Sequence, residues 1–190
     1  LISRKSKVTI KNVGLNEFRI GGIEILKLMG ANIQIDNIRK YGPEKIGDII
    51  VYSSELKGVN IPEKYIANAI DEFPILFIAA ANASGKTILK NAMELRFKES
   101  DRLASMSKGL LKCNINNTLL DDGIEIEGGK ISGATIDSYD DHRIAMSFAI
   151  AGIASSSTIT ILNTENVSTS FPGFDNLMRK MGLKIKRENI

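Results

Sequence analysis

The sequence contains very few residues of the kinds that build metal and thiol sites. Its 190 residues include one cysteine, Cys113, one histidine, His142, and no tryptophan. A single cysteine excludes an intramolecular disulfide, and this histidine and cysteine content is too low for a transition-metal centre. The composition therefore predicts a reduced, cytoplasmic globular protein without a bound metal.

Long hydrophobic runs and a large net charge are absent as well. The longest apolar run, Ile75–Ala81, is much shorter than the roughly 20 residues of a membrane span. The 25 lysines and arginines against 22 aspartates and glutamates give a net charge of +3, too small to indicate a nucleic-acid partner. The chain begins at Leu1 without a signal-peptide pattern, and we expect it to be part of a longer protein.

A strand–helix–strand pattern occurs three times along the chain, at intervals of about 70–80 residues. Each copy starts with the alternation typical of a strand, continues with a helix-like apolar spacing and ends with a second alternating segment. The predicted segments are 8–12, 23–29 and 31–35, then 86–91, 100–111 and 112–115, then 158–163, 174–181 and 182–186. Gly30 and Gly182 follow two of the helices, as C-terminal caps do.

The segments between the copies repeat too. A strand, a short strand and a strongly apolar helix are predicted at 48–53, 58–61 and 74–83, and again at 123–127, 130–136 and 142–154. Each unit thus runs strand, helix, strand, strand, helix, which predicts an α/β (α+β) fold of three pseudo-symmetric units. The first unit lacks the helix expected before Val8. The alternative is a chance likeness among segments rich in isoleucine, lysine and asparagine.

Cations stand at the start of the predicted helix 100–111. Ser100 or Asp101 is a suitable N-cap, but Lys98 and Arg102 lie at the positive end of the helix dipole, where a cation is unfavourable. A bound anion would reverse this, because free backbone N–H groups and a guanidinium could share it. The pattern therefore indicates an anion site.

Two further helix starts carry charge. Asp141 is the expected N-cap of the apolar helix that follows it, and Arg143 lies in the first turn of that helix. Asp71 precedes Pro74 at the start of another apolar helix, and a capping role is sufficient to explain this acidic residue taken alone. A pseudo-symmetric fold could direct the two arginine-bearing helix starts at one cleft.

Each of these charges also has a purely structural interpretation. Arg102 could form a surface ion pair with Glu99 or Asp101, and Arg143 could pair with Asp140. His142 is expected to be an exposed or capping residue rather than a metal ligand.

The Gly-Lys-Thr sequence within residues 82–87 suggests a nucleotide-binding P-loop. That motif needs a glycine where this chain has Ala80, so we interpret Ser84 and Gly85 as a turn between a buried helix and a strand. The basic segment 184–187 alternates with apolar residues, which predicts a strand with a solvated face.

Four motifs make the sequence similar to a known family. They are Ile70–Pro74, Arg96–Leu103, Asp140–Met146 and Thr169–Pro172. In this order and at this spacing they resemble the C-terminal half of the EPSP synthases, within the enolpyruvyl transferase family, over nearly the whole chain. Some members carry a lysine where this sequence has Thr169 and Ser170.

The resemblance implies a two-lobed enzyme in which each lobe is an inside-out α/β barrel of three pseudo-symmetric units. Residues 1–190 would be the C-terminal lobe, truncated in its first unit and without its N-terminal lobe. The missing lobe would be its main partner, and we expect a monomer at full length. No nucleic-acid or membrane partner is implied.

The implied reaction transfers the enolpyruvyl group of phosphoenolpyruvate to the 5-hydroxyl of shikimate 3-phosphate and releases phosphate, without a cofactor. By position, Asp71 would act as base near that hydroxyl and hold the shikimate ring, and Lys98 would contact the reacting groups. Glu99 would exchange a proton with the phosphoenolpyruvate methylene. Arg102 and Arg143 would bind the phosphate and carboxylate. We expect the isolated chain to be inactive, because half of the site would be missing.

Two alternatives remain. The first is UDP-N-acetylglucosamine enolpyruvyl transferase, a sister enzyme that the Lys-Glu-Ser-Asp-Arg sequence at 98–102 argues against. The second is a non-catalytic domain that keeps the fold. The presence of Asp71, Glu99, Arg102 and Arg143 disfavours it.

Overall fold

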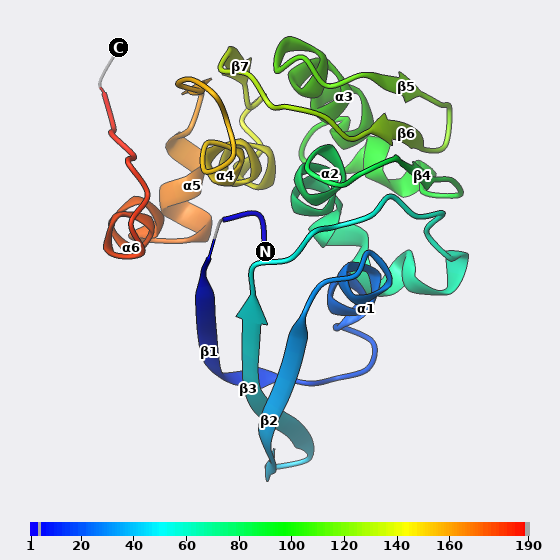
Figure 1. Cartoon of the computed structure of the whole chain (residues 1–190), viewed down its shortest axis with the longest axis vertical. Helices are drawn as coiled ribbons and strands as arrows, with labels where there is room; N and C mark the ends of the chain where they lie inside the picture. The colour runs from blue at the N-terminus through cyan, green and yellow to red at the C-terminus, as the bar shows by residue number, and fades with distance from the viewer. Residues whose placement is uncertain (4, 189–190) are drawn as a thin grey trace.

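The computed structural model describes residues 1–3 and 5–188, which form a mixed α/β arrangement of small sheets around helices (Figure 1). The strands are β1 (Lys7–Gly14), β2 (Ile33–Tyr41), β3 (Glu44–Tyr52), β4 (Lys86–Leu89), β5 (Asn117–Leu119), β6 (Ile124–Glu127), β7 (Thr135–Asp137) and β8 (Thr160–Leu162). Two antiparallel sheets have the orders β1-β3-β2 and β4-β6-β5, and β7 pairs with β8 in parallel. Both sheets therefore place the last of their strands in the middle.

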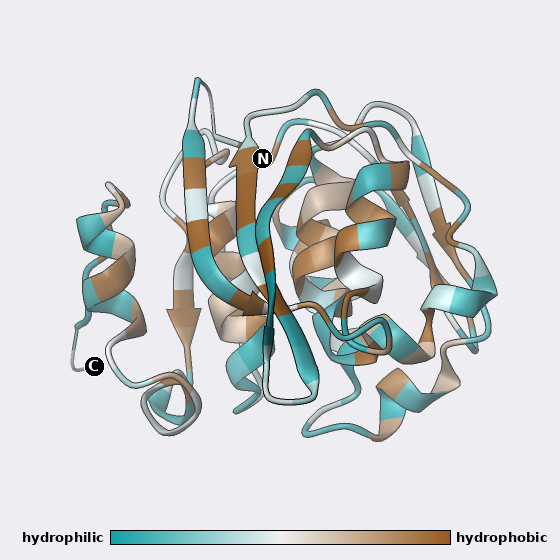
Figure 2. Ribbon diagram, turned by 90° about the horizontal axis from the view of Figure 1, so that it is seen from below, coloured by the Kyte–Doolittle hydropathy of each residue, from teal (hydrophilic) through white to brown (hydrophobic). Residues whose placement is uncertain are grey.

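The helices carry most of the hydrophobic core. They are α1 (Gly21–Leu28), α2 (Phe73–Ala81), α3 (Arg102–Lys112), α4 (His142–Ala151), α5 (Glu165–Ser170) and α6 (Phe174–Lys180), with 3₁₀ turns η1 (Glu63–Tyr65), η2 (Ala67–Glu72) and η3 (Met93–Phe97). Helix α2 contacts α1, α3 and α4, whereas β1 and β2 are largely exposed. Figure 2 shows the strands of the sheet β1-β3-β2, banded in brown and teal, in front of the helices.

Helix α2 is buried because its sequence is apolar on every side. All of its residues except Ile75 are buried, and Pro74 lies in its first turn, where the missing N–H costs nothing. Leu76 and Phe77 are 3% and 1% exposed, and burying such a side chain stabilises the fold by about 1.5–3 kcal/mol. This central helix confirms the prediction for 74–83 apart from its last residues.

Helices α3 and α4 approach each other closely at Gly109. A Cβ placed there would lie 2.3 Å from Cζ of Phe148, a distance that no side chain tolerates. The glycine therefore allows the Phe148 ring to lie directly on the backbone of α3. This contact sets the spacing of the two helices whose starts carry Arg102 and Arg143.

Most of the individual strands and helices predicted from the sequence are confirmed, but two of the predicted strands are wrong. The strand predicted at 112–115 does not form, because α3 extends to Lys112. Asn114, with φ of 63°, then turns the chain before β5 begins at Asn117. Residues 183–188 form no strand, since no neighbouring strand within the described ranges pairs with them, so the prediction for 182–186 and 184–187 is wrong.

The short strands between the copies are weaker than predicted. In the segment 58–61 the pairing consists of isolated parallel bridges, Lys57 to Ser84 and Asn60 to Ile88, and in 130–136 only the last residues belong to β7. The turn predicted in place of a P-loop is confirmed, since Gly85 has φ +84° between α2 and β4.

Three asparagines with positive φ repeat along the chain. Asn12, Asn91 and Asn163 follow the Thr-Ile run of β1, β4 and β8, with φ of 59°, 58° and 58°. Each asparagine donates a hydrogen bond to the carboxylate of an aspartate. The backbone N–H of Asn12 donates to Asp48 (2.9 Å), the backbone N–H of Asn91 to Asp122 (2.8 Å), and the side-chain amide of Asn163 to Asp137 (2.9 Å). Asparagine tolerates the left-handed region better than most residues. We call these contacts the three Asn–Asp pairs.

No helix within residues 1–3 and 5–188 has both the length and the apolar character needed to cross a membrane.

Candidate functional site

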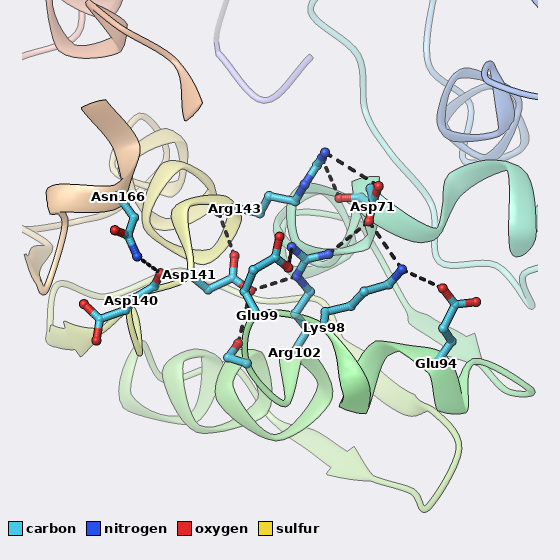
Figure 3. Close-up of polar contacts among 10 residues, drawn as sticks. Asp71, Glu94, Lys98, Glu99, Arg102, Asp140, Asp141, Arg143 and Asn166 are labelled. Atoms are coloured by element: carbon cyan, nitrogen blue, oxygen red, sulfur yellow. Dashed lines mark hydrogen bonds and ion pairs between the residues drawn. The ribbon is translucent and has the colours of Figure 1, made fainter. Parts of the chain in front are cut away.

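Seven charged side chains from separate parts of the chain meet at the starts of α2, α3 and α4 (Figure 3). We call them the Asp71 cluster: Asp71, Glu94, Lys98, Glu99, Arg102, Asp141 and Arg143. The structure thus brings together all five residues proposed from the sequence, over sequence separations of up to 72 residues.

Asp71 lies at the centre of the cluster. Its carboxylate accepts a hydrogen bond from Nη1 of Arg102 at 3.1 Å, and Lys98 Nζ and Arg143 Nη2 each lie 3.8 Å from it. The capping role that sufficed to explain Asp71 taken alone is not what the structure has, because Glu72 is the N-cap residue of α2 and no side chain caps that helix. Burial alone would raise the pKa of Asp71, but the charges of Arg143 and Lys98 and the Arg102 hydrogen bond hold it below its ordinary value.

Arg102 is the most deeply buried member of the cluster, with a side chain that is 0% exposed. Its guanidinium donates to Asp141 (2.8 Å), Asp71 (3.1 Å) and Glu99 (2.5 Å). The sequence suggested a surface ion pair of Arg102 with Glu99 or Asp101. Arg102 does pair with Glu99, but it is buried rather than on the surface, and its other partners are Asp141 and Asp71 instead of Asp101. Burial opposes the charged form of Arg102, but these carboxylates raise its pKa above the ordinary value.

Asp141 connects two helix starts. One of its oxygens accepts the backbone N–H of Arg143 at 2.9 Å, which confirms the predicted N-cap of α4. The other accepts from Arg102 Nε and from the hydroxyl of Ser100 at 3.1 Å, although the carboxylate is fully buried. The N-cap of α3 is Asp101, one of the two residues predicted for it. Nothing in the sequence near Asp141 indicated its contact with Arg102.

Lys98 lies between two carboxylates. Its Nζ is 2.5 Å from Glu94 Oε1 and 3.8 Å from Asp71 Oδ1, and the hydrogen bond to Glu94 is the main reason why the pKa of Lys98 is raised. The sequence interpretation missed Glu94. Its signal is the spacing of opposite charges four residues apart, which places side chains side by side on a helical turn.

Two residues of the loop before Arg143 have a left-handed backbone conformation. Tyr139 and Asp140 have φ of 53° and 56°, each a conformation that costs a non-glycine residue about 1–3 kcal/mol. Asp137 accepts the Tyr139 N–H at 2.8 Å, and the Asn166 amide of α5 donates to the Asp140 carbonyl. The proposed pairing of Arg143 with Asp140 is wrong, since Arg143 donates to the Asp71 carbonyl instead (2.8 Å).

The fourth motif lies outside these contacts. Thr169 and Ser170 end α5, which packs on α4, and among the described residues no hydrogen bond or ion pair links them to the cluster. His142 is half-buried at the start of α4.

The Asp71 cluster contains more negative than positive side chains. Its four carboxylates face three cations, so it has a net charge of −1. An incoming anion must therefore displace a carboxylate from a cation. The carboxylates of Asp71 and Glu99 are about half exposed, and this accessibility allows them to exchange protons with a bound molecule.

Two shallow hollows, of about 250 and 280 Å³, are lined by other residues, among them Lys86 and Glu125 in one and Asn60 and Lys90 in the other. Within residues 1–3 and 5–188, no group of histidine, cysteine, aspartate and glutamate side chains has an arrangement that could hold a metal ion.

The sequence matches one family over almost its full length. The sequence model of EPSP synthase (3-phosphoshikimate 1-carboxyvinyltransferase) matches residues 1–187. The 3-phosphoshikimate 1-carboxyvinyltransferase of Ruthia magnifica subsp. Calyptogena magnifica is 48% identical over 190 residues, and that of Legionella pneumophila (strain Lens) is 53% identical over 173. The alignments cover 99% and 91% of this chain but 44% and 40% of those proteins. The chain therefore spans less than half the length of these relatives.

Solved structures give the same picture. EPSP synthase from Acinetobacter baumannii has a TM-score of 0.96 and 48% identity, covering 99% of this chain and 44% of that one. The enolpyruvyl transferase NikO from Streptomyces tendae, at 17% identity and a TM-score of 0.71, covers 97% of this chain and 41% of its own, and shares the fold.

Proposed function

Because this chain belongs to the EPSP synthase family, we propose that it forms part of an enzyme that joins phosphoenolpyruvate to shikimate 3-phosphate. The enolpyruvyl group is transferred to the 5-hydroxyl of shikimate 3-phosphate, and phosphate is released. The observation that carries the proposal is the meeting of Asp71, Lys98, Glu99, Arg102 and Arg143 in one cluster. The identities of 48% and 53% to carboxyvinyltransferases favour this reaction over that of the sister enzyme acting on UDP-N-acetylglucosamine.

The two half-exposed carboxylates carry the proton transfers. Asp71 takes the proton of the attacking hydroxyl, and its lowered pKa keeps the carboxylate ionised before the substrates bind. Glu99 acts in its protonated form: it delivers its proton to the phosphoenolpyruvate methylene during addition and takes one back during elimination of phosphate. The proton accepted by Asp71 then passes to the released phosphate or to solvent. Their shared contact with Arg102 fixes both carboxylates in the same small region.

The cations neutralise the charge of the two substrates. Lys98 and Arg143, with side chains 21% and 33% exposed, meet the phosphate and carboxylate of phosphoenolpyruvate first. Arg102 is reached only when Glu99 or Asp71 turns away from it to act on the substrate. Until then it holds both carboxylates in place.

We further propose that residues 1–190 are the C-terminal lobe, an inside-out barrel of three pseudo-symmetric units with a second lobe as partner. Three observations support this: the repeated sheet order, the three Asn–Asp pairs, and helices that are more buried than the sheets. The net charge of −1 in the cluster also supports a second lobe, which would supply further cations.

The test uses the full-length protein. It should release phosphate only when phosphoenolpyruvate and shikimate 3-phosphate are both present, and the isolated chain should not. Arg143→Ala should raise the Michaelis constant for phosphoenolpyruvate about tenfold or more, as expected for loss of a hydrogen bond to a charged group. Glu99→Gln should lower kcat more than it changes binding. Transfer to UDP-N-acetylglucosamine but not to shikimate 3-phosphate would refute the proposal.

A further inference from the structure

Glu94 belongs to the Asp71 cluster but has no role in the proposed reaction. It lies on η3, four residues before Lys98, and its carboxylate is 1.3 Å closer to the Lys98 ammonium than that of Asp71 is (2.5 against 3.8 Å; Figure 3). Glu94 is therefore the nearest counter-ion of Lys98.

The fold does not explain this carboxylate. Among the described residues, the Glu94 side chain has Lys98 as its polar partner, and no side chain caps η3. The Glu94 side chain is 64% exposed, whereas that of Lys98 is 21% exposed. If the pair separates, Glu94 can be hydrated at once, while Lys98 remains directed at Asp71.

The other cations of the cluster are held more firmly. Arg102 is fully buried against three carboxylates, one of them also buried, and Arg143 uses one nitrogen on the Asp71 carbonyl. Lys98 alone has the most exposed carboxylate of the cluster as its closest partner. Of the hydrogen-bonded ion pairs of the cluster, the Lys98–Glu94 pair is thus the one that an incoming anion breaks at the lowest cost, because Glu94 is the most exposed of the carboxylates.

We propose that Glu94 is an internal counter-ion of Lys98, which an anionic group of phosphoenolpyruvate replaces when it binds. This rests on the proposed function. Glu94 sets substrate affinity by competing for the ammonium and takes no part in the chemical steps. The hydrogen bond to Glu94, which raises the pKa of Lys98, agrees with this pairing in the empty site.

The first test compares Glu94→Gln with a matched control in the full-length protein. The control is Glu24→Gln, which removes a similar exposed pair, Glu24 with Lys27 at 3.0 Å, on helix α1 outside the Asp71 cluster. Removing the competitor should lower the Michaelis constant for phosphoenolpyruvate about two- to fivefold, as expected for an exposed ion pair, and leave kcat unchanged. The gain should shrink as salt is raised toward 1 M, because salt screens the competition.

A second measurement needs no turnover. The rate at which an amine-acylating reagent modifies Lys98, followed by mass spectrometry, should rise in Glu94→Gln and not in Glu24→Gln, because the amine loses its proton more easily without the carboxylate. An unchanged rate would overturn the pairing.

The two proposals fail in different ways. A wild-type protein without turnover would refute the proposed function. If the wild-type protein is active but Glu94→Gln and Glu24→Gln have the same Michaelis constant for phosphoenolpyruvate, the counter-ion role is refuted. A raised Michaelis constant and lowered kcat in Glu94→Gln would refute it as well, since Glu94 would then be needed to position Lys98.

Discussion

Replacing Arg102 by methionine is the most severe perturbation that the site offers. Methionine has a similar length but no charge, so the variant leaves the fully buried carboxylate of Asp141 without its cation. The half-exposed carboxylates of Asp71 and Glu99 lose a partner too, but water can solvate them. The cost therefore comes mainly from Asp141.

The magnitude follows from these burials. Breaking a buried ion pair by removing one partner costs about 3–5 kcal/mol. Asp141 keeps its hydrogen bonds from the Arg143 N–H and the Ser100 hydroxyl, so the expected loss of stability is about 3 kcal/mol. The two exposed pairs add less than about 1 kcal/mol each. With a urea m-value of about 2 kcal/mol/M, the midpoint of unfolding should fall by about 1.5–2 M.

Urea unfolding followed by far-ultraviolet circular dichroism measures this shift, since the sequence has no tryptophan to report it by fluorescence. Arg179→Met is the matched control, because Arg179 forms an exposed pair with Asp175 on α6 and should change the free energy of unfolding by less than about 0.5 kcal/mol. In the double variant Arg102→Met, Asp141→Asn, the second change should recover about 1–3 kcal/mol. A fall in midpoint below about 0.5 M, or strictly additive losses, would refute the buried-pair argument.

Three further outcomes can be checked by thermal or chemical unfolding. Thr87→Val should raise the free energy of unfolding by about 1 kcal/mol, because the buried Thr87 hydroxyl has no hydrogen-bond partner among the described residues; a loss would mean that water satisfies it. Gly109→Ala should cost about 1–3 kcal/mol by forcing Phe148 away from α3, and an unchanged Tm would contradict the close contact. Since the pKa of Asp71 is lowered, its ion pairs stabilise the fold above the ordinary aspartate value of about 4 and are lost as the pH falls through the lower folded value. The Tm of Asp71→Asn should therefore fall less steeply below about pH 4 than the Tm of the wild type. The same pH dependence in both proteins would contradict this argument.

The sequence sufficed for the elements whose patterns are local. The apolar helix α2, the caps Asp101 and Asp141 and the turn at Gly85 are each determined by a few neighbouring residues. The strand expected at 182–186 failed because alternation makes a strand possible while a neighbouring strand makes it form, and none is present within the described ranges.

The sequence predicted five of the seven members of the Asp71 cluster but not their contacts. Charged helix starts and motif order identified Asp71 and Arg102, but local spacing suggested Asp101 as a partner for Arg102 and missed Asp141, which lies 39 residues away. A residue's burial depends on contacts between distant segments. The sequence therefore could not reveal that Arg102 is the buried centre of the site rather than a surface cation.

The double contact of Asp141 also affects how the site can move. One rigid, buried carboxylate fixes the first turn of α4 through the Arg143 N–H and the first residue of α3 through the Arg102 guanidinium. The two helix ends are thus coupled and cannot shift separately without leaving that carboxylate unpaired, a loss of several kcal/mol. Because both arginines depend on this one carboxylate, we expect any closure over a ligand to move them together.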